Sequence, residues 1–158
     1  MARTSYAIAL GSNMRSRHGS PAETVRAALD MLQPVRISRL RATPALGPAG
    51  RSFANAVAIV DSGLLPDALL GQLKAIEREF GRRGGRRWGP RVLDLDIILW
   101  SGGAWGGPGP LVPHAEFRKR AFVLRPLAEL EPGWRDPITG ATMRQLLARL
   151  TAPRPNPR

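Results

Sequence analysis

The sequence predicts an α+β sandwich, with helices on one face of a mainly antiparallel sheet. One observation leads to this class, and two others set the number of domains and exclude some chemistry. Apolar periodicity alternates between strand-like and helix-like segments in the order β-α-β-β-α-β. The 158 residues, 43% of them hydrophobic, suffice for one core and show no internal repeat. Cysteine is absent, which excludes disulfide bridges, a thiol nucleophile and thiolate metal ligands. We therefore expect one domain over residues 1–158.

The first half of the chain contains a helix start and three strand-like segments. Residues 6–10 form a short apolar strand that ends in a turn over residues 11–13. A helix begins after Ser20, because a serine cap is followed by Pro21 and, three residues after the cap, by Glu23. Residues 35–41 alternate like a half-buried strand, and residues 43–52 are rich in proline and glycine and predict a loop. Residues 53–60 are apolar enough for a central strand, in which Asn55 is the odd polar member.

The second half completes the pattern and extends beyond it. Residues 66–80 predict an amphipathic helix, residues 81–90 a loop, and residues 93–99 a strand. Residues 101–110 are a glycine-rich surface connection, a last helix begins near Thr142, and residues 151–158 form a frayed tail. The order of elements is that of the ferredoxin-like sandwich, a βαββαβ core, followed in this chain by a C-terminal extension.

The chain is strongly basic, with a net charge of +12 from 24 basic and 12 acidic residues. Such a balance attracts nucleic acid, anionic membranes or phosphorylated small molecules. A compositional bias toward arginine explains the total equally well, but it does not explain where the arginines cluster. The first residues contain too short an apolar stretch for a signal peptide, and charged residues interrupt every long apolar run. We expect a cytoplasmic protein without a membrane partner.

Two aspartates stand out in the segment RRWGPRVLDLDIILW, which covers residues 86–100. Alternation along a strand places Asp94 and Asp96 on one face, roughly 6.5–7 Å apart. It places four apolar residues on the other face, toward the core: Leu93, Leu95, Ile97 and Leu99. Like charges on one face repel unless a cation neutralises them, and carboxylate oxygens suit Mg²⁺. An exposed edge strand is the commoner structural explanation of such a pair.

Arginines precede this strand in a glycine-containing loop: Arg82, Arg83, Arg86, Arg87 and Arg91. Guanidinium groups bind phosphate oxygens in a bidentate manner. Carboxylates that hold magnesium beside such a loop are the parts of a phosphoryl-transfer site. The sequence contains no GxxxxGK[ST] motif, so a P-loop enzyme is excluded. Taken alone, an arginine-rich loop is most often a solvated face.

The motifs together resemble one enzyme family. RWGPRVLDLDIIL is similar to the central signature of the 6-hydroxymethyl-7,8-dihydropterin pyrophosphokinases of folate biosynthesis. IALGSN resembles the first strand and turn of this family, TPALGP its first mobile loop, and FANAVAIV the segment with a pterin-binding asparagine. LVPHAEFRKRAFVLRPLAEL is similar to its later signature. The resemblance implies a ferredoxin-like fold and transfer of the β,γ-pyrophosphate of ATP to the pterin hydroxymethyl group, with release of AMP.

The resemblance also implies the residues of the site. Catalytic residues are Arg82, Arg91, Asp94 and Asp96, with the two aspartates as ligands of two Mg²⁺ ions. Pterin-binding residues are Thr43, Pro44, Ala45, Leu46, Phe53, Asn55, Trp88 and Phe122. ATP-binding residues are Lys74, Glu77, Arg87, Ile97, His114 and Arg120. The implied partners are ATP and the pterin, without nucleic acid, and the implied state is a monomer.

Other interpretations remain open on the sequence alone. A basic ferredoxin-like domain could bind RNA, although only 6% of the residues are aromatic and the motif of RNA-binding strands is missing. A small regulatory domain that binds a ligand without chemistry is a third possibility. At the level of residues, Asn55 could make a structural hydrogen bond, Phe53 and Phe122 could be core aromatics, and His114 could cap a turn.

Overall fold

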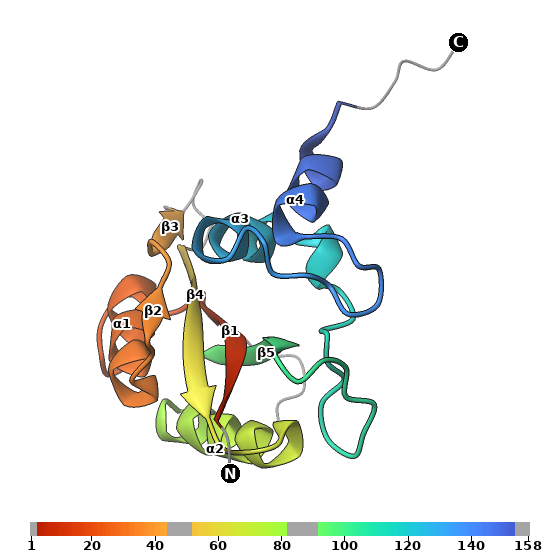
Figure 1. Cartoon of the computed structure of the whole chain (residues 1–158). Helices are drawn as coiled ribbons and strands as arrows, with labels where there is room; N and C mark the ends of the chain where they lie inside the picture. Colours follow the sequence, from red (N-terminus) through yellow and green to blue (C-terminus); the bar gives the residue numbers. More distant parts are fainter. Residues whose placement is uncertain (1–2, 44–51, 82–91, 154–158) are drawn as a thin grey trace.

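The computed structural model describes residues 3–43, 52–81 and 92–153, and it has an α+β architecture (Figure 1). The strands are β1 (Thr4–Ser12), β2 (Arg36–Ile37), β3 (Arg41–Thr43), β4 (Phe53–Ser62) and β5 (Asp94–Trp100). The helices are α1 (Pro21–Leu32), α2 (Pro66–Glu79), the 3₁₀ helix η1 (Phe117–Lys119), α3 (Ala121–Leu130) and α4 (Met143–Thr151). The strand order is β2-β4-β1-β5, β3 also pairs with β4, and every pair is antiparallel.

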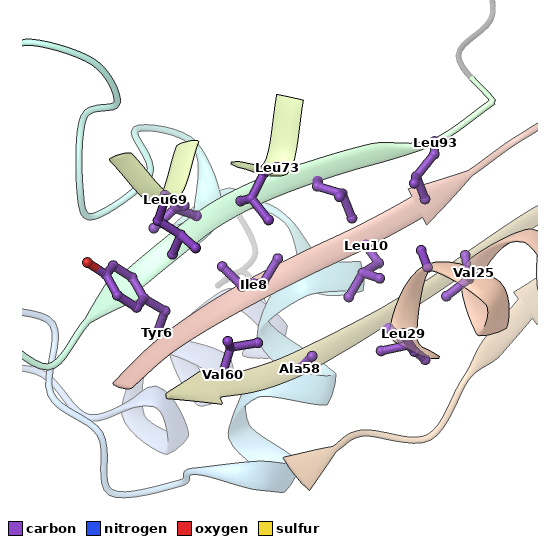
Figure 2. Packing of buried hydrophobic residues seen from close by; sticks show 14 of the residues in the cluster. Tyr6, Ile8, Leu10, Val25, Leu29, Ala58, Val60, Leu69, Leu73 and Leu93 are labelled. Carbon is purple, nitrogen blue, oxygen red and sulfur yellow. The ribbon is translucent and has the colours of Figure 1, made fainter. Parts of the chain in front are cut away.

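The sheet is covered on both faces, which corrects the prediction of helices on one face only. One hydrophobic cluster joins the sheet to α1 and α2, and its labelled members in Figure 2 include Ile8, Leu29 and Leu73. A second cluster joins the opposite face to α3 and α4 through residues such as Val57 and Leu124. The inner strands are apolar on both faces, so each face needs a cover. The second face is covered by α3 and α4, which follow β5 in the chain.

Two of the predicted helix starts, after Ser20 and near Thr142, are confirmed by their caps. Ser20 Oγ accepts a hydrogen bond from the Glu23 N–H, and the Glu23 carboxylate accepts one from the Ser20 N–H. Hydrogen bonding of the Ser20 backbone N–H to the Glu23 carboxylate, and then that of the Ser20 side chain, lowers the pKa of Glu23 below its ordinary value. Thr142 and Gln145 form the same reciprocal box at the start of α4. At the start of α1 and of α4, the box thereby satisfies two of the backbone N–H groups that a helix start leaves unpaired.

The prediction that Leu99 faces the same side as Leu95 is wrong. In the pairing of β1 with β5, Ile8 is opposite Ile97, but the preceding Ala7 is opposite Leu99. This register shift leaves an extra residue, Ile98, on β5, as in a β-bulge. Leu99 therefore packs with Ile98 in the cluster on the α3 face. The two aspartates precede the shift and keep their alternation.

The strand predicted over residues 35–41 is broken into two short pieces. Only Arg36 and Ile37 pair as β2, both of them exposed, and Ser38 bonds with both its backbone and its side chain to Val57. The chain then pairs again as β3, which includes Thr43 although the loop was predicted to start there. At the other end, α4 includes Thr151, the first residue of the predicted tail.

Within the described parts of the chain, no helix has the length and apolar character needed to cross a membrane.

Candidate functional site

The candidate site lies where β1 ends and the neighbouring strands β4 and β5 begin, on the face of the sheet that α3 covers. Gly11 of β1 is opposite Asn55 of β4 and, on its other side, opposite Asp94 of β5. Residues opposite each other in an antiparallel sheet point to the same face. Antiparallel pairing thus places an amide and a carboxylate on either side of a glycine, although the three residues are far apart in sequence.

Gly11 keeps the floor of this site open. A Cβ atom at this position would lie 3.1 Å from Asn55 Oδ1, closer than most real contacts of such atoms. A glycine inside a strand often marks the close approach of a ligand or another backbone. From the sequence, residue 11 was assigned only to the start of a turn. The signal that could have identified it as a site residue is that this glycine continues the alternation of the strand.

Two adjoining hollows open above this floor. The larger has a volume of about 400 Å³ and is lined by Gly11, Ser12, Asn13, Phe53, Asn55, Asp94 and Phe122. The smaller, of about 140 Å³, is lined by Ala9, Leu10, Gly11, Asn55, Ala56, Asp94, Asp96, Arg120, Phe122 and Val123. Because Gly11, Asn55, Asp94 and Phe122 line both, the hollows form one continuous site. One part is walled by aromatic rings, and the other contains both carboxylates and a guanidinium group.

The aromatic residues of the larger hollow are exposed rather than buried in the core. Phe53 is 45% exposed and Phe122 is 51% exposed, which contradicts the alternative of core aromatics. The Arg120 guanidinium lies 5.8 Å from the centre of the Phe122 ring. Exposed rings that line a hollow beside an amide and a cation suit a flat, polar ligand.

The aspartates point into the site as the alternation predicted. Asp96 is opposite Ala9 and Asp94 is opposite Gly11, and both carboxylates are half-buried. Among the described residues, no group of three or more His, Cys, Asp or Glu side chains is close enough to hold a metal ion. Two carboxylates hold a hard cation only weakly unless other oxygens complete its shell, as bound phosphates do for Mg²⁺. The donor set therefore fits a magnesium ion that arrives with a phosphorylated ligand.

Several residues predicted to bind the nucleotide lie outside the two hollows. The Ile97 side chain is buried on the opposite face of the sheet, in the cluster with α1 and α2. Glu77 of α2 is 1% exposed and accepts a hydrogen bond from the Leu95 N–H at 3.3 Å. The Lys74 Nζ lies 3.1 Å from the Glu77 carboxylate. Among the predicted ATP-binding residues that the structure describes, only Arg120 lines the site.

His114 caps a turn beside β5. Its backbone N–H donates a hydrogen bond to the Ile98 carbonyl oxygen at 3.0 Å, and its ring Nδ1 accepts one from the Glu116 backbone N–H at 3.1 Å. An imidazole nitrogen that accepts a hydrogen bond is unprotonated, so in the neutral ring the proton is on Nε2. His114 therefore has the structural role that its sequence position left open, and it keeps one ring donor for another partner.

Part of the predicted site lies outside the described residues. This part comprises Pro44, Ala45, Leu46, Arg82, Arg87, Trp88 and Arg91. Thr43 is the last residue of β3, where its Cα is paired with that of Phe53. Among the described residues, sequence reasoning missed Gly11 and Asn13 as site residues because it assigned them to a turn.

Comparison with known proteins places the chain in a family. The model of the 7,8-dihydro-6-hydroxymethylpterin-pyrophosphokinase family matches residues 7–132. A 2-amino-4-hydroxy-6-hydroxymethyldihydropteridine pyrophosphokinase of Pseudomonas aeruginosa is 44% identical over 148 residues, which cover 89% of this chain and 88% of the relative. Proteins of the same name from Methylorubrum extorquens and Haemophilus influenzae are each 38% identical, with 90% and 80% of this chain and 91% and 81% of the relatives covered. The chain belongs to the 7,8-dihydro-6-hydroxymethylpterin-pyrophosphokinase family.

Proposed function

We propose that this protein transfers the β,γ-diphosphate of ATP to the hydroxymethyl group of 6-hydroxymethyl-7,8-dihydropterin, in folate biosynthesis. The products are AMP and the pterin diphosphate. Membership of the family supports the reaction. The observation that carries it in this chain is the aromatic hollow with Asn55, which adjoins the two carboxylates and Arg120. The comparisons lend no support to a nucleic-acid-binding module.

The larger hollow is proposed as the pterin site. Its volume of about 400 Å³ lies within the range of roughly 300–1,000 Å³ that is usual for small-molecule sites. Phe53 and Phe122 are on separate elements and present exposed rings, so they could pack on the faces of a flat ring system. The Asn55 amide both donates and accepts, and it matches the alternating donors and acceptors at the edge of a pterin.

The smaller hollow is proposed as the place where the diphosphate is transferred. Asp94 and Asp96 would hold Mg²⁺, two ions being proposed, and the metal would supply positive charge against the phosphate oxygens. Arg120 lines the same hollow and would neutralise phosphate charge from the other side. Arg82 and Arg91 are proposed, by resemblance alone, to bind the transferred group.

The residues of this chain would act mainly by positioning. The hydroxymethyl oxygen forms a bond to the β-phosphorus, the bond from that phosphorus to the oxygen of AMP breaks, and the hydroxyl proton is lost. The stacked ring and the Asn55 contact would aim the hydroxymethyl group from the larger hollow into the smaller one. Reactants held in such an orientation react far faster than free ones, and phosphoryl transfer depends largely on positioning and charge.

The remaining nucleotide contacts are proposals with unequal support. Arg120 has the most, because it lines the hollow of the aspartates. His114 can offer its Nε2–H to a ribose or phosphate oxygen, since Nδ1 is already engaged by the Glu116 N–H. Lys74, Glu77, Arg87 and Ile97 are supported by resemblance alone. Glu77 also fixes the backbone of β5 between the two aspartates, through the Leu95 N–H.

The architecture supports a wider proposal. The strand order β2-β4-β1-β5, with α1 and α2 on one face, fits a ferredoxin-like core extended by residues 101–153. We propose a single domain, which the one sheet with a hydrophobic cluster on each face supports, and we propose that it acts as a monomer. The use of ATP favours a location in the cytoplasm.

The reaction itself is tested by the dependence of AMP formation on the pterin. AMP should appear from ATP only when Mg²⁺ and 6-hydroxymethyl-7,8-dihydropterin are both present, in a one-to-one ratio with the pterin diphosphate. ADP in place of AMP would indicate an ordinary kinase, and ATP turnover that ignores the pterin would refute the proposed function.

Asn55→Ala is expected to weaken pterin binding while leaving nucleotide binding close to wild type. Loss of one buried hydrogen-bond partner costs about 1–3 kcal/mol. Titration with a fluorescent pterin and, separately, with a non-hydrolysable ATP analogue gives both affinities. Gln72→Ala is the matched control, because Gln72 is an exposed amide on α2, away from the site. Equal weakening of both ligands, or an unfolded domain, would instead make Asn55 a structural residue.

A further inference from the structure

Asn13 is a polar residue of the larger hollow to which no role has yet been given. It follows the last residue of β1 and continues the alternation of Ala9 and Gly11, so it points toward the same face. The preceding Ser12 is 5% exposed, and its hydroxyl donates to the Met14 carbonyl oxygen at 3.3 Å, across Asn13. This bond closes a small turn around Asn13 and holds its side chain at the end of the hollow.

The side-chain oxygen of Asn13 is buried, and it has no hydrogen-bond partner among the described residues. In the described part of the chain, Asn13 Oδ1 is the one buried side-chain nitrogen or oxygen atom in this condition. A buried acceptor without a donor costs on the order of 1–3 kcal/mol. Native structures contain few such atoms, and functional sites are among the places where they persist. Asn13 lines the larger hollow, and an acceptor of this residue that the described part of the protein leaves without a donor suggests that the ligand supplies one.

We propose that Asn13 binds the pterin, with its Oδ1 accepting a hydrogen bond from an N–H group of the pterin ring. This inference rests on the proposed function and extends it to a residue outside the sets assigned above. The pterin carries an amino group and ring N–H groups along its edge, so it has the donors that the oxygen lacks.

The position of Asn13 selects the ring rather than the hydroxymethyl group as the donor. Ala9 lies opposite Asp96 and lines the smaller hollow, Gly11 lies opposite Asp94 and lines both, and Asn13 lines only the larger. Each step of two residues moves roughly 6.5–7 Å along the strand. Asn13 is therefore at the end of the site that is far from Asp96. The hydroxymethyl group must face the phosphates near Asp96, which leaves the ring for Asn13.

The test is the variant Asn13→Ala, with three readouts that together distinguish a ligand contact from a merely structural role. Pterin affinity should fall by about 5- to 100-fold, because the ring donor loses its acceptor. The melting temperature of the ligand-free protein should stay level or rise, because an unsatisfied buried oxygen is removed. The affinity for a non-hydrolysable ATP analogue should stay close to wild type. Asn13→Asp retains an oxygen at this position and should bind pterin better than Asn13→Ala, in titrations without Mg²⁺.

An analogue comparison identifies the donor. Binding of 6-hydroxymethyl- and 6-methyl-dihydropterin is measured for the wild type, Asn13→Ala and the control Gln72→Ala. A similar loss with both ligands in Asn13→Ala supports a contact to the ring. A loss confined to the hydroxymethyl compound overturns this assignment, as do wild-type pterin affinity, a lowered melting temperature, or an Asn13→Asp variant as weak as the alanine variant. If the wild type bound neither pterin and formed no AMP, the proposed function itself would fail.

Discussion

Asp96→Ala is expected to abolish nearly all diphosphate transfer while the fold survives. Asp96 points into the hollow that also contains Asp94 and Arg120. If the two aspartates hold Mg²⁺ as proposed, a site with one carboxylate left can no longer hold the ion against the phosphates at the reacting position. Loss of one well-placed electrostatic group in a transition state lowers kcat by about 100- to 1,000-fold. This factor is a lower bound if Asp94 and Asp96 share a metal ion as proposed. The same outcome is expected for Asp94→Ala.

Steady-state AMP formation, measured over a range of Mg²⁺ concentrations, checks this expectation. Asp30→Ala is the matched control, because Asp30 is an exposed carboxylate on α1, on the other side of the sheet. Two like charges on one face repel, so the melting temperature of Asp96→Ala should not fall. An Asp96→Ala enzyme with wild-type turnover at saturating Mg²⁺ would remove the basis for the metal assignment.

Asp136→Ala is expected to cause a large loss of stability, in contrast to the substitutions within the site. Asp136 is fully buried, and its two carboxylate oxygens accept hydrogen bonds from Arg118 at 2.5 and 2.8 Å. They also accept from the Ile138 N–H at 2.9 Å and from the Thr139 hydroxyl at 2.8 Å. This carboxylate joins η1 to the turn that leads into α4.

The loss should be about 2–4 kcal/mol, below the full cost of breaking a buried pair, because Arg118 is 28% exposed and can turn to water. For a chain of this length the melting temperature should fall by roughly 5–15 °C. Glu116→Ala is the matched control, since the Glu116–Lys119 pair on the same segment is exposed and contributes little. Calorimetry or thermal denaturation gives both values, and equal shifts for the two variants would contradict the expectation.

The same carboxylate makes stability depend on pH in the acid range. Burial raises the pKa of Asp136, but the hydrogen bonds from Arg118, Ile138 and Thr139 outweigh it and lower the pKa from 3.8 to about 2. Between these values the unfolded chain binds a proton that the folded chain does not. The stabilisation is therefore present in full above pH 3.8 and is lost as the pH falls toward about 2. In Asp136→Ala, this part of the acid-induced loss of stability should disappear.

The sequence by itself determined the order of elements, because the signals that start helices and strands are local. Ser20, Pro21 and Glu23 lie within one helical turn, and the capping box forms from them without help from the rest of the chain. Alternation was likewise sufficient to place Asp94 and Asp96 on one face of β5. The family resemblance followed from such short, contiguous motifs.

Pairing between strands was decided by the tertiary structure alone. The bulge at Ile98 turns Leu99 to the other face, because register depends on β1 as well as on β5. The row of Asn55, Gly11 and Asp94 depends on two registers at once. The second helical layer on the sheet also followed from packing, since the sequence shows that α3 is apolar but not which face it covers.

Contacts between polar groups that are distant in the sequence could not be predicted from it either. Arg118 and Asp136 are 18 residues apart, and nothing in the sequence indicates that they form a hydrogen-bonded pair or that the Asp136 carboxylate is buried. In the sequence Asn13 is an ordinary turn residue; the structure shows that it lines a hollow and that its buried oxygen has no donor among the described residues. The physical reason is common to both cases. Periodicity and caps arise from a few neighbouring dihedral angles, whereas burial and hydrogen-bond satisfaction depend on which distant segments the folded chain brings together.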